Sequence, residues 1–90
     1  MTDELADLRA QLDAIDDQLL VLLAQRARVV AQAWASKRAR GVSIRDAQRE
    51  ASILAQARQR AVELGLDPDA VAVVMALIVG RDLRQKPNDP

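Results

Sequence analysis

The chain begins with one long amphipathic stretch, residues 4–40, which reads ELADLRAQLDAIDDQLLVLLAQRARVVAQAWASKRAR. Its large apolar residues recur at alternating spacings of three and four, the heptad pattern of a helix that packs along a seam. This apolar seam comprises Leu5, Leu8, Leu12, Ile15, Leu19, Leu22, Val29 and Ala33. Arg26 interrupts it. The stretch therefore predicts one helix over about residues 3–40, which ends at Gly41 after a basic last turn.

The length of this helix predicts a dimer. At 1.5 Å per residue it would extend about 57 Å, whereas a compact globule of 90 residues has a radius of gyration of only about 12 Å. The rest of the chain therefore cannot cover the whole seam. A second copy of the chain is the simplest structure that does so, which predicts an intertwined homodimer.

Two shorter helices are predicted downstream. The first spans about residues 44–64 and has an alanine-rich apolar stripe, formed by Ala47, Ala51, Leu54, Ala57 and Ala61. Gly65 suits the left-handed position that ends a helix, and Asp67-Pro68 supplies the cap and first-turn proline of the next. That helix spans about residues 68–86, Pro87 ends it, and residues 87–90 form a frayed tail. The prediction is one all-α domain, residues 1–90, with three helices per protomer.

The composition excludes several classes of site. The chain has no His and no Cys, which removes Ser-His-Asp catalysis, cysteine nucleophiles and His- or Cys-ligated zinc. The three glycines do not form a GxGxxG dinucleotide-binding motif or a glycine-rich phosphate-binding loop. Trp34 is the single aromatic residue, so stacking of nucleic-acid bases is not supported. With no apolar run of membrane length and an acidic start, we expect a cytoplasmic protein without metal, cofactor, nucleic-acid or membrane partner.

Charge is distributed unevenly along a chain whose net charge is zero. Residues 1–25 carry six acids and one base, whereas residues 26–49 carry seven bases and one acid. Cations gathered in the middle of a neutral chain favour a local anion site, although a solvated basic face would give the same count.

The spacing of the central cations indicates where such a site would lie. Arg26 and Lys37 are eleven residues apart, close to three helical turns, so they share a face with backbones about 16 Å apart. That separation leaves room for one small anion, although Arg26 could instead pair with a carboxylate or reach solvent. Arg9 lies about 25 Å before Arg26 along the helix, and it could reach the same ligand only from a second, antiparallel protomer.

A second cluster lies on the next helix, where Asp46, Arg49 and Glu50 project from one face. They form either a surface ion-pair cluster or the edge of a ligand site. Cations and carboxylates without a nucleophile, metal or imidazole serve covalent and redox chemistry poorly. They suit a unimolecular rearrangement. Such a reaction requires the protein to hold the substrate in a reactive conformation and to place hydrogen-bond donors where charge develops.

The series Leu8-Arg9, Ile15-Asp16, Leu22 to Arg26, Lys37 and Ile44 to Glu50 resembles the all-α chorismate mutases. The resemblance implies an intertwined three-helix homodimer with two shared sites. It also implies an isomerase that converts chorismate to prephenate by a pericyclic shift, in the shikimate pathway toward phenylalanine and tyrosine. An enzyme of the same pathway is a possible partner.

The resemblance also implies roles for the charged residues. Arg26 would bind one substrate carboxylate, and Arg9 of the other protomer would bind the second. Lys37 would donate to that carboxylate and to the ether oxygen. Glu50 would accept a hydrogen bond from the substrate hydroxyl beside the Asp46 backbone. Arg49 would support the carboxylate cluster.

The chain departs from the family pattern on the third helix. The family has a polar residue there, usually Gln, that completes the contact with the ether oxygen, and a Ser one turn earlier. Matching without gaps places Lys86 and Asp82 at those positions, while Gln85 is one residue away. Either Lys86 replaces the amide or a register change brings Gln85 inward. Trp34 stands where the family often has a small residue, and we interpret it as a core or interface anchor.

Three alternatives stay open. An isochorismate-pyruvate lyase that forms salicylate resembles the mutases in fold and cations, although the loop over residues 38–46 looks more mutase-like. A mutase that acts on an amino-substituted chorismate would use the same charges. A non-catalytic helical dimer, serving as an interaction or regulatory module, would explain the seam but not Arg26 within it.

Overall fold

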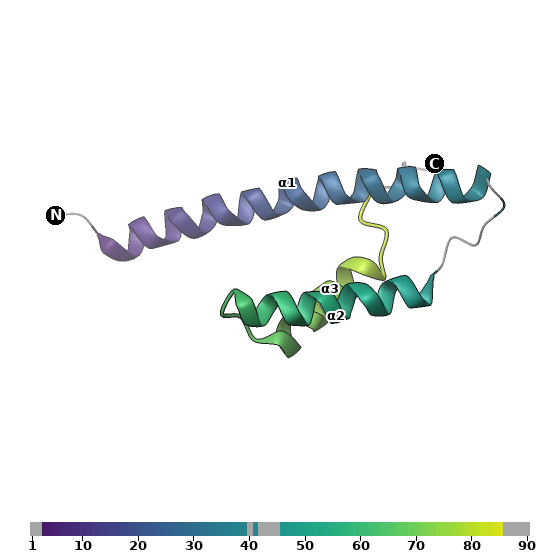
Figure 1. Ribbon diagram of the computed structural model, residues 1–90. Coiled ribbons are helices and arrows are strands. Elements are labelled where there is room, and N and C mark those ends of the chain that lie inside the picture. The colour runs from purple at the N-terminus through teal and green to yellow at the C-terminus, as the bar shows by residue number, and fades with distance from the viewer. Residues whose placement is uncertain (1–2, 40, 42–45, 86–90) are drawn as a thin grey trace. The chain divides into compact units, whose positions relative to one another are not determined.

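A computed structural model describes residues 3–39, 41 and 46–85 (Figure 1). They form three helices, α1 (Glu4–Ala39), α2 (Ala47–Glu63) and α3 (Pro68–Val79), and the described residues contain no strand. The all-α prediction is confirmed. Contacts divide the chain into two units: α1 up to Ala33 with the segment that starts at Leu83, and residues 34–82.

Helix α1 is the long helix that the heptad pattern predicts. Its first turn is capped by Asp3, whose Oδ1 accepts hydrogen bonds from the backbone N–H groups of Leu5 (3.1 Å) and Ala6 (3.4 Å). After the helix, Gly41 has φ +70° and donates its N–H to the Arg38 carbonyl over 3.1 Å. A left-handed residue at this position is favourable only for glycine or asparagine, so Gly41 ends the helix as expected.

The turn between α2 and α3 is also built as the sequence predicts. Gly65 has φ +76°, and the N–H groups of Leu66 and Gly65 donate to the carbonyls of Ala61 (2.8 Å) and Val62 (3.1 Å). These two bonds make a Schellman motif, which satisfies the last carbonyls of α2. Asp67 then caps α3 by accepting the Asp69 N–H over 3.0 Å, with Pro68 in the first turn.

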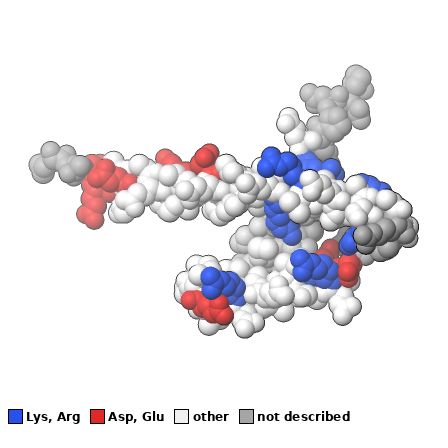
Figure 2. Space-filling view, turned by 45° about the horizontal axis from the view of Figure 1, so that its top comes forward, with Lys and Arg blue, Asp and Glu red and all other residues white. Residues whose placement is uncertain are grey.

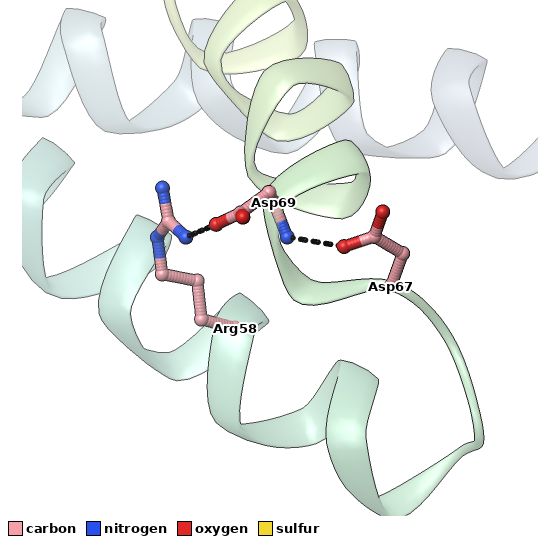
Figure 3. Close-up of polar contacts among 3 residues, drawn as sticks. All are labelled: Arg58, Asp67 and Asp69. Atoms are coloured by element: carbon pink, nitrogen blue, oxygen red, sulfur yellow. Dashed lines mark hydrogen bonds and ion pairs between the residues drawn. The ribbon is translucent and has the colours of Figure 1, made fainter.

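An ion pair adds to the junction of the two helices. Figure 3 shows Arg58 of α2 reaching the carboxylate of Asp69 at the start of α3, beside the Asp67 cap. Both side chains are at least half exposed, so the pair contributes no more than about 1 kcal/mol to stability. It ties the N-terminal end of α3 to the C-terminal half of α2.

Packing of α2 on α3 uses small residues. Ala61 and Ala72 are the two buried hydrophobic residues among those described, at 1% and 6% exposure. The half-buried positions around them on α2 are Glu50, Ile53, Leu54 and Ala57. Ala47 and Ala51, which the predicted stripe included, are exposed. The packed face of α2 is therefore rotated slightly about the helix axis relative to the predicted alanine stripe. It includes the carboxylate of Glu50.

Both shorter helices differ from their predicted bounds. Helix α2 begins at Ala47 rather than near residue 44, because Asp46 is extended (φ −132°) and caps it; residues 42–45 lie outside the described residues. Helix α3 ends at Val79 rather than at residue 86, and Gly80 caps it. Glycine has the lowest helix propensity after proline, which is the physical reason for the early end.

The apolar seam of α1 is exposed in this chain. Each of its large residues, Leu5, Leu8, Leu12, Ile15, Leu19, Leu22 and Val29, is between 47% and 62% accessible. With two buried hydrophobic residues in the described part, the chain has little core of its own. No helix of that part has both the length and the apolar content needed to span a bilayer.

Candidate active site

Arg26 and Lys37 lie on the same face of α1, as their spacing predicts. Both are half-buried, as are Val30 and Trp34 between them, whereas Arg28 and Arg38 on other faces are exposed. The half-buried positions of α1 are Leu23, Arg26, Ala27, Val30, Ala31, Trp34 and Lys37, and we call them the cation face. Two long cationic side chains thus extend from backbone positions about 16 Å apart on one half-buried face of α1.

Neither cation of this face is neutralised within the described residues. Arg58 pairs with Asp69 and Arg60 with Glu63, whereas neither Arg26 nor Lys37 has a carboxylate partner among the described residues. A partly desolvated charge without a partner is costly, so proteins keep such groups where a ligand or another chain supplies the counter-charge. The cation face is therefore suited to an anion with two charged groups.

The first turn of α2 presents the second predicted cluster. The Asp46 carboxylate accepts the Arg49 N–H over 3.0 Å, and the Asp46 carbonyl accepts the Glu50 N–H over 3.0 Å. Asp46 therefore caps the start of α2. Arg49 is exposed, whereas Glu50 is half-buried on the face that packs toward α3. Glu50 is thus the member of the cluster best placed to meet a partly enclosed ligand.

Arg9 is exposed near the N-terminal end of α1, among acidic residues. Figure 2 shows Asp and Glu side chains over the N-terminal part of α1, and Lys and Arg side chains farther along. Seventeen residues, about 25 Å, separate Arg9 from Arg26 on the helix axis. The structure therefore does not bring Arg9 to the cation face of its own α1.

The residues predicted on the third helix lie beyond its end. Asp82 and Gln85 are exposed in the irregular segment that follows Gly80, and Lys86 lies outside the described residues. The structure accordingly does not place these side chains on α3, as a helix over residues 68–86 would have done. The choice between Gln85 and Lys86 as the donor to the ether oxygen stays a prediction.

Trp34 was expected to be a core or interface anchor, but no such role was predicted for the other apolar members of the cation face. Leu23, Ala27, Val30 and Trp34 are half-buried, whereas Val29 and Ala33 of the predicted seam are exposed. Their spacing of four, three and four residues was available in the sequence as a second helical stripe. Arg26 lies where the two stripes meet, which explains why a cation at this position is partly covered.

The chemistry available to these groups is electrostatic. Guanidinium and ammonium groups bind carboxylates and stabilise an oxygen on which charge develops, and a carboxylate such as Glu50 accepts a hydrogen bond from a hydroxyl. These groups can therefore bind an anionic ligand and stabilise charge that develops on it.

Comparisons with known proteins bear on the family of the chain. The family described as chorismate mutase type II matches residues 8–84. The T-protein of Enterobacter agglomerans is 39% identical over 89 residues, which cover 99% of this chain and 24% of that protein. The chain thus spans about a quarter of the length of this curated relative. No solved structure matches the chain significantly. On the family match over residues 8–84, the chain belongs to the chorismate mutase type II family.

Proposed function

We propose that this chain is a chorismate mutase, an isomerase that rearranges chorismate to prephenate on the way to phenylalanine and tyrosine. The observation that carries the proposal is the pair Arg26 and Lys37, half-buried on one helical face without a carboxylate partner among the described residues. The family match indicates that chorismate is the anion that this pair would bind.

In the proposed mechanism the protein binds the substrate and polarises its ether oxygen. All the atoms whose bonds form or break belong to the substrate. Arg26 binds one carboxylate of chorismate, and Lys37 donates to the other carboxylate and to the ether oxygen. As the C–O bond breaks and a C–C bond forms in the same step, negative charge grows on that oxygen. A donor fixed there stabilises the transition state more than the ground state.

The α2 cluster and the segment after α3 complete the proposed site. Glu50 accepts a hydrogen bond from the substrate hydroxyl, beside the backbone of Asp46, and Arg49 supports the carboxylates. The segment after Gly80 contributes Asp82 and either Gln85 or Lys86 near the ether oxygen. Holding the substrate in the reactive conformer removes an entropic barrier, which is the second source of acceleration.

The proposed working form is an intertwined homodimer with two shared sites. Support comes from the apolar seam of α1, whose large residues are about half exposed, and from the scarcity of buried residues in the described chain. Exposed apolar residues in a continuous helical stripe are the usual mark of a helix that packs on a partner. A second copy would cover the seam and provide the missing core.

Charge complementarity favours an antiparallel arrangement of the two α1 helices. Within α1, residues 4–25 carry a net charge of −4 and residues 26–39 a net charge of +4. Parallel helices would align like charges, whereas antiparallel helices place the acidic half of each beside the basic half of the other. The same arrangement carries Arg9 of one protomer toward the cation face of its partner, where it binds the second substrate carboxylate.

A direct assay tests the proposed activity. Purified protein is incubated separately with chorismate and with isochorismate, and the loss of each is followed together with the product formed. We expect chorismate to yield prephenate and isochorismate to persist. A non-reactive dicarboxylate that mimics the transition state should inhibit turnover and raise the melting temperature, because it binds the folded protein alone.

The other outcomes of this assay are equally decisive. Release of pyruvate and salicylate from isochorismate would identify a lyase and overturn the proposal. If neither substrate is consumed and millimolar mimic leaves the melting temperature unchanged at low salt, the chain is a non-catalytic helical module.

The rate should depend little on pH near neutrality. The chain has no His, the one side chain whose unperturbed pKa places its change of charge between pH 5 and 8. The rearrangement also transfers no proton to the protein. We therefore expect kcat/KM to vary by less than about twofold across that range. A bell-shaped profile centred near pH 7 would contradict the mechanism.

A further inference from the structure

Trp34 lies on the cation face between the two cations of the proposed site. Arg26, Trp34 and Lys37 belong to the continuous helix α1, and all three are half-buried. At 1.5 Å per residue, Trp34 follows Arg26 by about 12 Å and precedes Lys37 by about 4.5 Å along the helix axis. With 3.6 residues per turn, it is rotated by about 60–80° from both. Its place relative to the two cations therefore follows from the geometry of one helix.

Helix geometry directs the side chain of Trp34 back toward the space between the cations. In an α-helix each Cα–Cβ bond tilts toward the N-terminus, so a large side chain covers the turn before its own Cα. For Trp34 that turn contains Val30 and Ala31, which are also half-buried and lie near the midpoint between Arg26 and Lys37. An anion bound by both cations lies over this turn, and the indole flanks it on one side.

An indole at this place supplies the type of contact that the cations lack. Guanidinium and ammonium groups bind the charged groups of a ligand, and they do not recognise the apolar ring that carries those groups. Trp34 is the only aromatic residue of the chain, and an indole offers a large, rigid apolar surface at little entropic cost. Trp34 already interacts within the chain. An indole has two faces, however, and one of them can still contact a ligand.

We propose that Trp34 is a specificity-determining residue, which contacts the carbocyclic ring of the dicarboxylate held by Arg26 and Lys37. The inference rests on the proposed function and adds to it a residue that selects the ring of the substrate rather than its charges. The cations select two carboxylates, whereas the indole favours cyclic over flexible acyclic dicarboxylates. A core or interface anchor, in contrast, would stabilise the protein without touching the ligand.

Two inhibitors separate contact with the ring from other effects of Trp34. One is the cyclic transition-state mimic, and the other is malate, an acyclic hydroxydicarboxylate of the same charge. We expect Trp34→Ala to raise the inhibition constant of the mimic about tenfold, as the loss of about 55 Å² of apolar contact would do. The inhibition constant of malate should change less than about twofold. Trp34→Phe keeps a smaller ring and should stay within about threefold of the wild type for the mimic.

The fluorescence of Trp34 gives a readout that needs no variant. Since the chain has one Trp and no Tyr or Phe, the emission reports this position alone. Saturating mimic, which has no aromatic group, should shift the emission to shorter wavelength because the ligand replaces water at the ring. The half-saturating concentration should equal the inhibition constant. Malate should leave the emission wavelength unchanged.

Gln32→Ala is the matched control. Gln32 is two residues away on α1 and exposed, on the opposite side of the helix from the cation face. Its removal should change neither of the two inhibition constants, and the mimic should shift the emission of Trp34 as in the wild type.

The outcomes distinguish this role from the proposed activity. If Trp34→Ala weakens mimic and malate equally, or lowers the melting temperature with both inhibition constants unchanged, Trp34 does not contact the ring and the proposal is refuted while the mutase stands. An emission that saturating mimic leaves unchanged refutes it too, even if Trp34→Ala fails to fold. If the wild type neither binds the mimic nor consumes chorismate, the proposed function itself has failed.

Discussion

Arg26→Ala is expected to lower kcat/KM by at least about 10²–10³-fold while the dimer remains assembled. The loss follows from removing a fixed donor to a substrate carboxylate, and such donors are worth that much in electrostatic catalysis. Assembly should persist because Arg26 interrupts an apolar seam and has no carboxylate partner among the described residues. Replacing a partly buried charge by an apolar group is then neutral or stabilising.

Arg28→Ala is the matched control for this measurement. Arg28 is two residues away on α1 but exposed on another face, so its removal changes the net charge equally without touching the cation face. We expect near-normal turnover from it. Steady-state kinetics and sedimentation are measured on both variants. If Arg26→Ala dissociates or unfolds, or if both variants lose activity alike, Arg26 is a structural residue and the proposed site is incorrect.

Mixing Arg9→Ala with Arg26→Ala should restore activity that neither variant has alone. In the proposed dimer each site takes Arg26 from one protomer and Arg9 from the other. Random exchange of subunits makes half the dimers mixed, and each mixed dimer has one intact site. An equal mixture refolded together should therefore recover about a quarter of the wild-type activity, measured per chain by chorismate consumption.

A second mixture provides the negative control. Arg26 and Lys37 belong to the same face of the same α1, so every site in a mixture of Arg26→Ala with Lys37→Ala lacks one of them. No activity should return. Recovery in this control, or none in the first mixture, would show that the subunits do not share their sites in the proposed way.

The helical content and most helix ends could be predicted from local sequence. Asp67-Pro68, Gly65 and Gly41 act through the conformation of one or two residues and the nearest backbone groups, so their effect does not depend on distant contacts. The spacing of Arg26 and Lys37 is likewise a property of one helix. The all-α fold and the shared face of these two cations were accordingly expected before the structure.

Features that depend on packing could not be read from the same patterns. Helix α3 stops at Val79 because propensity alone does not carry a helix across Gly80, and periodicity cannot measure that balance. The Asp46 carboxylate caps α2, which leaves the predicted place of its backbone beside the substrate hydroxyl a prediction.

For this protein, the sequence by itself determined three helices, their turns and the pairing of two cations on α1, because each arises from periodicity and from short-range backbone chemistry. Only the tertiary structure decided which residues of α2 pack toward α3, with Ala61 buried and Glu50 half-buried. That outcome depends on contacts between two helices, which the periodicity of one helix does not encode. The end of α3 before Gly80 is instead a balance of local helix propensities, which the apolar pattern does not measure.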